Sequence, residues 1–253
     1  MKKMMRSQLE ENFSSFFEKW MCQLEEYVQL LLSFSRGKEF HNESEFEGMV
    51  NKLTALHKEY YTTKWAAAHQ DVCVFFSPIW LSPFEKALLW ITGWKPSSVF
   101  RVFDSLRKSQ LLVDISEEQL KKIDGLKAKI SLDEEKVERE MERQQVAVAN
   151  RRMVELAGLA SRIRRSSGGN SGGPGAAQID ALVEVAIKGM ISGLERVMKM
   201  GDCVRLKTLK GLLDLLNPIQ SVDLLAAFSM VQIQMRKWGK KKDMINQLCS
   251  QIS

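Results

Sequence analysis

The side chains with the most potential for chemistry are three histidines, His41, His57 and His69, and four cysteines. His57 and His69 are twelve residues apart, so they share roughly one side of a helix but lie more than three turns apart, too far to bind one metal ion. No serine, cysteine or carboxylate motif accompanies them, and the chain contains no phosphate-binding glycine loop and no zinc-protease motif. The sequence therefore predicts a protein that is not an enzyme, with no catalytic residues and no metal site.

The cysteines and the overall composition indicate the cellular compartment of the protein. Cys22, Cys73, Cys203 and Cys249 are far apart and none belongs to a CxxC pair, which is typical of reduced, mostly buried thiols. The chain has no run of eighteen apolar residues and no secretory signal at its N-terminus. These features predict a protein of the nucleus or the cytoplasm without a transmembrane segment.

The elements that would position these residues are helices. Apolar residues recur at three- and four-residue steps from Phe13 to Leu31, which predicts a long amphipathic helix with an aromatic stripe. A second helix is expected from about residue 45 to 76, before Pro78. Further helices are expected at 97–108, 117–165, 179–197, 202–216 and 218–238. Because no segment has the pattern of a strand, the predicted fold class is all-α, a multi-helix bundle.

One short segment, WLSPFEKALLWITGWKPSS at residues 80–98, contains both a start and a stop signal for a helix. Ser82 can cap the helix, Pro83 falls at its first position, and Glu85 can reach back to the cap. Gly93 would end the helix in a left-handed conformation. The apolar residues between these signals predict a buried helix that forms the hub of the fold.

The tryptophans divide into core and surface candidates. Trp20, Trp80 and Trp90 recur with other apolar residues at helical spacing, so we expect them in the core. Trp94 stands beside Lys95 in the loop after the hub helix, where an aromatic side chain can anchor a protein interface. Trp94, Lys95 and Trp80 are the candidates for partner binding.

Two charged residues on the second helix look buried. Lys64 and Asp71 are seven residues apart and therefore share one helical face. An unpaired charge is costly to bury. We expect these two residues to pair with Glu85 or with a backbone cap in a structural polar network.

Residues 117–143 form a charged helix with nine acidic and seven basic side chains. Ile123, Ile130 and Val137 repeat every seven residues, whereas the partner positions of the heptad hold Lys127 and Glu134. Two arrangements fit: a coiled coil with a second copy, giving a homodimer, and an exposed connecting helix. The sparse apolar positions favour the connecting helix.

A Gly/Ser-rich stretch divides the chain. Residues 166–178, SSGGNSGGPGAAQ, have the composition of a flexible linker that is disordered in isolation. Before it we expect a flexible N-terminus at 1–12 and an aromatic-rich helical half with the charged helix at 13–165. After it we expect helices at 179–239 that pack back on the same domain, followed by a basic tail at 240–253.

The net charge of +6 is concentrated in two basic patches. Such patches can bind phosphates or an import receptor, and they equally suit the C-terminal ends of solvent-exposed helices. Their members are Arg162, Arg164, Arg165, Arg236, Lys237, Lys240, Lys241 and Lys242.

Many of these positions match the pattern of a known family. The matching residues in the first hundred positions are Lys64, Ala66, Ala67, Ala68, Asp71, Trp80, Pro83, Glu85, Leu89, Trp90, Gly93, Ser97 and Ser98. With them the chain resembles the plant Delay of Germination family, which shares its domain with the C-terminal half of the TGA class of bZIP transcription factors. Residues 16–20 and 208–238 agree as well, and residues 115–142 resemble the dormancy proteins more than the TGA factors.

The resemblance implies a non-enzymatic plant regulator that binds other proteins in seed dormancy and germination, abscisic-acid signalling or transcriptional regulation. It implies type 2C protein phosphatases or bZIP factors as partners. Because the shared domain begins within about twelve residues of Met1, we expect no bZIP segment and no direct sequence-specific DNA binding.

Two alternatives stay open. One is a membrane-associated scaffold like the branch of the family that marks pollen apertures, and the other is a sensor that binds haem or lipid in the helical core. Dormancy members of the family carry two histidines one turn apart before the terminal Trp-Gly, where this chain has Gln232 and Arg236. Neither is a good iron ligand, so no cofactor is predicted, and His57 and His69 remain the other possible ligands.

Overall fold

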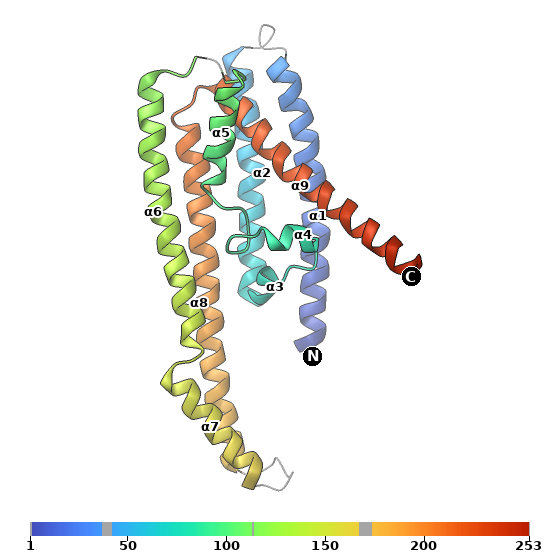
Figure 1. Ribbon diagram of the computed structural model, residues 1–253, viewed down its shortest axis with the longest axis vertical. Coiled ribbons are helices and arrows are strands. Elements are labelled where there is room, and N and C mark those ends of the chain that lie inside the picture. The colour runs from blue at the N-terminus through green and yellow to red at the C-terminus, as the bar shows by residue number, and fades with distance from the viewer. Residues whose placement is uncertain (1, 37–41, 113, 167–173, 253) are drawn as a thin grey trace.

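The computed structural model describes residues 2–36, 42–112, 114–166 and 174–252, and their regular structure is helical (Figure 1). In chain order the helices of these ranges are α1 (Lys2–Arg36), α2 (Glu43–Gln70), α3 (Cys73–Phe76), α4 (Pro83–Ala87), α5 (Ser98–Lys108), α6 (Glu117–Ala147), α7 (Arg151–Ser166), α8 (Pro174–Leu213) and α9 (Pro218–Ile252). The described ranges contain no strand, and their one isolated β-type pairing joins Trp90 and Gly93. The predicted all-α class is confirmed.

The aromatic stripe of α1 packs into a first core formed mainly with α2 and α9. Phe13, Phe17 and Trp20 are buried there, and the Trp20 indole donates from Nε1 to the carbonyl of Leu56 at 3.1 Å. The helix starts at Lys2, so most of the segment 1–12, expected to be flexible, is helical. Leu9 explains the extension because it lies one turn before Phe13 and is buried in the same core.

The second predicted helix is two helices in the structure. The chain leaves the helical conformation at Asp71, where φ is −155° and ψ is 102°. The Asp71 carboxylate accepts the backbone N–H of Cys73 at 2.9 Å and so starts α3. Asp71 is therefore a helix-boundary residue, and its carboxylate lies 3.9 Å from Nε of Arg6, not beside Lys64 or Glu85.

The two long C-terminal helices pack against most of the other helices. Helix α8 lies beside α6 and α7, and α9 crosses α1 and α2 (Figure 1). A second core lies mainly among α5, α6, α8 and α9. The two helices predicted at 179–197 and 202–216 form one continuous α8, and Asp202 is a buried residue within it.

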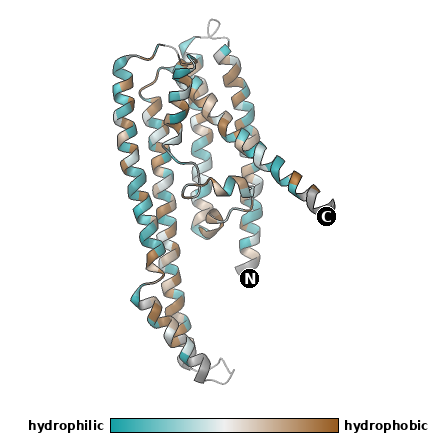
Figure 2. Cartoon of the chain, in the orientation of Figure 1, coloured by the Kyte–Doolittle hydropathy of each residue, from teal (hydrophilic) through white to brown (hydrophobic). Residues whose placement is uncertain are grey.

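Helix α6 is neither an exposed connecting helix nor free to pair through its heptad stripe. Ile123, Ile130 and Val137 are buried in the second core, against α8. Hydrophilic residues cover much of the rest of α6 (Figure 2). The stripe is therefore covered within the chain, and it is not accessible to a second copy in this conformation.

The predicted helix at 117–165 is also divided, since α6 ends at Ala147 and α7 begins at Arg151. Helix α7 packs against the first half of α8. Of the basic patch that it carries, the side chain of Arg162 is described and exposed, whereas those of Arg164 and Arg165 lie outside the described set. Most of the predicted linker, residues 167–173, lies outside the described ranges, and from Pro174 onward the chain belongs to α8.

Candidate functional site

Helix α4 begins as its sequence predicts. The Ser82 hydroxyl accepts the N–H of Glu85 at 3.2 Å, the Glu85 carboxylate accepts the N–H of Ser82 at 2.9 Å, and Pro83 occupies the first turn. The helix nevertheless ends at Ala87, and none of its five residues is buried. The predicted hub helix is therefore wrong, and residues 88–97 form a loop that we call the tryptophan loop.

The turn within the tryptophan loop is tight. Trp90 and Gly93 exchange two backbone hydrogen bonds of 2.8 and 3.1 Å, while Ile91 and Thr92 adopt positive φ angles of 49° and 77°. Gly93 is not the left-handed end of a helix. A Cβ at this position would lie 2.8 Å from Cζ of Arg205, so glycine is required by the close approach of that side chain.

A buried charge network, made of Lys64, Asp202 and Arg205, lies beneath the loop. Lys64 of α2 donates from Nζ to the Asp202 carboxylate at 2.8 Å and to the hydroxyl of Thr92 at 3.0 Å. Burial lowers the pKa of Lys64 to about 8, and the Asp202 charge opposes that shift. The partner of Lys64 is thus Asp202 on α8, and the expected pairing with Glu85 is wrong, whereas the expected backbone contact is present, since Lys64 also donates to the carbonyl of Thr92 at 3.3 Å.

Arg205 connects the same carboxylate to both ends of the turn. Its Nη1 donates to Asp202 at 2.6 Å, and its Nε donates to the carbonyl of Trp94 at 2.7 Å. A further bond from Nη2 reaches the carbonyl of Trp90, and the guanidinium lies over the Trp90 ring, 5.2 Å from its centroid. Side chains from α2 and α8 therefore fix the loop through its backbone.

Helix α6 holds the outer side of the tryptophan loop. Glu138 accepts from Nε1 of Trp90 at 2.7 Å and from Nζ of Lys95 at 2.9 Å, and the Lys95 ammonium holds the pKa of Glu138 below its usual value. Buried Glu134 accepts the backbone N–H of Ser97 at 2.6 Å. Trp90 is half-buried and packs at the edge of the second core, whereas Trp20 is buried in the first core as expected.

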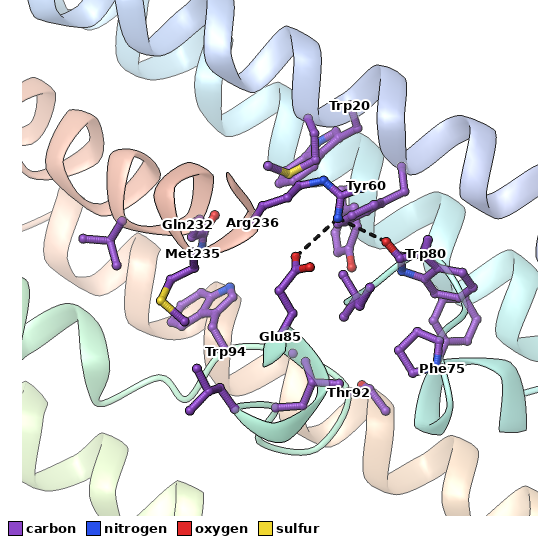
Figure 3. Close-up of a pocket in the computed structure, with 18 of the residues that line it drawn as sticks. Trp20, Tyr60, Phe75, Trp80, Glu85, Thr92, Trp94, Gln232, Met235 and Arg236 are labelled. Carbon is purple, nitrogen blue, oxygen red and sulfur yellow. Dashed lines mark hydrogen bonds and ion pairs between the residues drawn. The ribbon is translucent and has the colours of Figure 1, made fainter. Parts of the chain in front are cut away.

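A cavity of about 240 Å³ lies next to the loop, among residues of α1, α2, α4 and α9 (Figure 3). Its walls are largely apolar, and their aromatic side chains include Trp20, Tyr60, Phe75 and Trp94. Trp80 also lines it, and its ring packs against Phe75 with centroids 5.4 Å apart. Because Trp80 is buried in the first core, the structure does not present it as a surface anchor.

Arg236 brings charge to the wall of this cavity. Its Nη1 donates to the carbonyl of Trp80 at 3.1 Å and to the Glu85 carboxylate at 3.3 Å, as the dashed lines in Figure 3 show. Its Nη2 forms an ion pair with Glu18. Arg236 is therefore an internal tie from α9 to α1 and α4, and its assignment to an exposed basic patch is wrong.

Other members of that patch also have partners within the fold. Lys237 pairs with Glu25, and Lys240 lies 3.2 Å from the carboxylate of Glu18. The Lys242 ammonium lies over an aromatic ring, 5.8 Å from the centroid of Phe84. Lys241 is exposed. The segment expected to be a separate basic tail thus continues α9, and its first lysines belong to the folded domain.

An exposed apolar strip borders the cavity. We call it the mouth surface and define it by Leu88, Trp94, Val231, Met235 and Trp238. The first four line the cavity, and Trp238 follows Met235 by three residues on the same face of α9. Leu88 and Trp238 are 56% and 57% exposed, whereas Trp94 is half-buried against Phe228. Large apolar side chains gathered at one place on a surface typically mark an interaction site.

The sequence of this chain is similar to those of several plant proteins. A family model described as seed dormancy control matches residues 23–105, which include the tryptophan loop and much of the cavity wall. The protein DOG1-like 4 of Arabidopsis thaliana is 48% identical over 238 residues, which cover 94% of this chain and 96% of that protein. The chain belongs to the DOG1, or Delay of Germination, family.

More distant relatives extend the DOG1 family relationship. Protein ZW2 of Arabidopsis thaliana is 27% identical, covering 90% of this chain and 96% of its own. Transcription factor TGA2.3 of Oryza sativa subsp. japonica is 26% identical over 88% of this chain but only 62% of its own. The DOG1 relationship makes this chain one of a group of plant regulatory proteins.

The potential ligands of the DOG1-family chain are dispersed. Within the described ranges no three His, Cys, Asp or Glu side chains are placed to hold a metal ion. His57 lines the cavity together with Gln232, whereas His69 lies 3.5 Å from Glu195 on the surface. Cys22 and Cys203 are exposed, which corrects the expectation of mostly buried thiols.

Sequence reasoning did not assign Asp202, Arg205 or Trp238 to this DOG1-family site. Asp202 and Arg205 are three residues apart on α8, a spacing that suits an ion pair on one helical face. Trp238 follows Val231 and Met235 at helical spacing, which signals a continuous apolar strip. These patterns were visible in the sequence, but the partners of Asp202 and Arg205 lie on distant segments.

Proposed function

We propose that this DOG1-family protein is a non-enzymatic regulator that acts by binding other proteins in seed dormancy and the response to abscisic acid. The matched family model is described as seed dormancy control. A relative from Arabidopsis thaliana, 23% identical over 89% of this chain, is named Response to ABA and Salt 1. Both descriptions support a role in this physiology.

The observation that carries the proposal is the mouth surface. It combines an exposed tryptophan, Trp238, with exposed Leu88 and Val231 on a rigid helix and the loop next to it. Tryptophan is enriched among residues that dominate binding energy, especially where neighbouring contacts exclude water. A partner segment with apolar anchors would therefore complement this strip.

The partners that we propose are type 2C protein phosphatases, with bZIP factors as the second class. Similarity to TGA2.3, a transcription factor by name, supports a transcriptional setting and a nuclear location. The half-buried Trp94 would contribute its accessible edge, and Lys95 a charge at the border of the loop. Neither side chain would need to leave its contacts within the fold.

Affinity purification from plant tissue, followed by mass spectrometry, tests the proposal. We expect the wild-type protein to recover type 2C phosphatases and Leu88→Ser to lose them. Leu132→Ser on α6 is the matched control, because Leu132 is also 56% exposed but lies away from the cavity. Equal recovery by both variants would contradict the mouth surface as the binding site. Recovery of membrane or cell-wall factors without a phosphatase would favour the pollen-type scaffold instead.

A further inference from the structure

The cavity beside the tryptophan loop opens onto the mouth surface. Leu88 and Val231 line the cavity and are 56% and 49% exposed, so it reaches solvent between the tryptophan loop and α9. Phe75 and Trp80 also line it and are buried in the first core. Figure 3 shows these two side chains across the cavity from Trp94. The cavity is therefore a pocket that leads from an exposed apolar surface to a buried wall.

The rings on the wall suit an aromatic occupant. Trp80 packs edge to face against Phe75 with centroids 5.4 Å apart, and Trp94 packs in the same way against Phe228 at 4.8 Å. Aromatic rings favour such tilted contacts, and a further ring can make them with these walls. A cavity of about 150 Å³ is large enough to bind benzene. The volume of about 240 Å³ therefore leaves room for a larger ring system.

The charges on the cavity wall are already paired. Among the described lining residues, Glu85 and Arg236 are ionised, and their side chains lie 3.3 Å apart. Arg236 also pairs with Glu18 of α1. Burial lowers the pKa of His57, which lines the same wall, and so favours its neutral ring. The wall therefore favours an uncharged occupant, because a charged group would lose its hydration without gaining a partner of opposite charge.

We propose that the cavity receives a large aromatic side chain, such as tryptophan, from the protein partner that binds the mouth surface. The inference rests on the proposed function, because that side chain belongs to the bound partner. Residues that dominate binding energy are enriched in tryptophan and tyrosine, and they fill pockets from which the surrounding contacts exclude water. Four residues belong both to the cavity wall and to the mouth surface and would surround the inserted ring: Leu88, Trp94, Val231 and Met235.

A titration tests the cavity without any partner. N-acetyltryptophanamide, an uncharged capped tryptophan, is added at millimolar concentration to protein with ¹³C-labelled methionine methyl groups. Met21 and Met235 line the cavity, whereas Met244 is 64% exposed farther along α9 and is not among the lining residues. We expect the resonances of Met21 and Met235 to shift and that of Met244 to stay in place.

Two further probes separate the ring from the rest of the molecule. N-acetylalaninamide has the same capped backbone without the ring, and N-acetyllysinamide carries a positive charge. We expect neither to shift the resonances of Met21 or Met235. Equal shifts with all three probes, or no shift with N-acetyltryptophanamide, would overturn the inference.

A cavity-filling variant connects the cavity to the partner. Gln232 is half-buried, lines the cavity from α9 and is not part of the mouth surface, so Gln232→Trp places a ring at the cavity wall. This variant should lose the methionine shifts and raise the Kd for a purified type 2C phosphatase at least about tenfold, with unchanged circular dichroism. Gln29→Trp on α1 is the matched control, because Gln29 is exposed and is not among the lining residues, and it should change neither result.

The outcomes distinguish this inference from the proposed function. A Gln232→Trp protein that takes up no N-acetyltryptophanamide but binds the phosphatase with wild-type Kd would overturn the inference and leave the proposed function intact. Wild-type protein that shows the methionine shifts but binds no phosphatase would contradict the proposed function instead. The titration of wild-type protein needs no variant, so it decides whether the cavity takes up the ring even if Gln232→Trp fails to fold.

Discussion

Replacing Asp202 by asparagine should destabilise the fold strongly. The Asp202 carboxylate is fully buried and accepts from Lys64 at 2.8 Å, from Arg205 at 2.6 Å and from Nε1 of Trp65 at 2.9 Å. Asparagine preserves the shape and one acceptor oxygen but removes the negative charge. It thus leaves two buried positive charges uncompensated, and breaking a buried ion pair in this way costs about 3–5 kcal/mol.

The assay is urea unfolding at pH 7, followed by far-ultraviolet circular dichroism. For a chain of this length the expected loss corresponds to a fall in Tm of about 10 °C. Asp180→Asn is the matched control, because Asp180 lies on the same helix and is exposed, and it should change the free energy of unfolding by less than about 0.5 kcal/mol. An Asp202→Asn protein within about 1 kcal/mol of wild type would refute the reasoning.

Two further predictions concern Lys64 and Gly93. Because burial lowers the pKa of Lys64 to about 8 from 10.5, only the unfolded chain holds that proton between these pH values, so stability should rise with pH there. Above pH 8, the free energy of unfolding of the wild-type protein, measured with urea, should rise relative to that of Lys64→Met by up to about 1.4 kcal/mol per pH unit. Parallel pH profiles for the two proteins would contradict this prediction. Gly93→Ala should destabilise by about 1–3 kcal/mol in the same assay, because the new Cβ meets Arg205. Gly48→Ala on α2, with nothing within 4 Å of its new Cβ, should instead stabilise by about 0.5–1 kcal/mol, and equal effects of the two alanines would rule out a close approach at Gly93.

Local signals in the sequence predict the structure where their partners are also local. The start of α4 needs only Ser82, Pro83 and Glu85, all within four residues, and the structure has the predicted capping box. That helix ends at Ala87, several residues before the end that Gly93 predicts. The chain turns there because Arg205, more than a hundred residues away, binds two carbonyls of the loop, and nothing near Gly93 encodes that contact.

Periodicity showed that a surface is buried but not what buries it. The heptad of Ile123, Ile130 and Val137 correctly marks the apolar face of α6, yet α8 of the same chain covers it. Lys64 likewise looked buried, but its partner Asp202 is 138 residues away and on another helix. The charge and spacing of a side chain indicate that it needs a partner. The tertiary structure determines which residue that partner is.

The central claim, that the mouth surface binds a protein partner, is tested most directly by calorimetric titration of purified protein with a purified type 2C phosphatase. Trp238→Ala should raise Kd at least about thirtyfold. This change is equivalent to a loss of about 2 kcal/mol in binding free energy, as expected for an anchoring tryptophan. Its circular dichroism should match that of wild type, because the side chain is 57% exposed, and Leu132→Ser should bind normally. A Trp238→Ala protein that binds the phosphatase with wild-type Kd would contradict the claim.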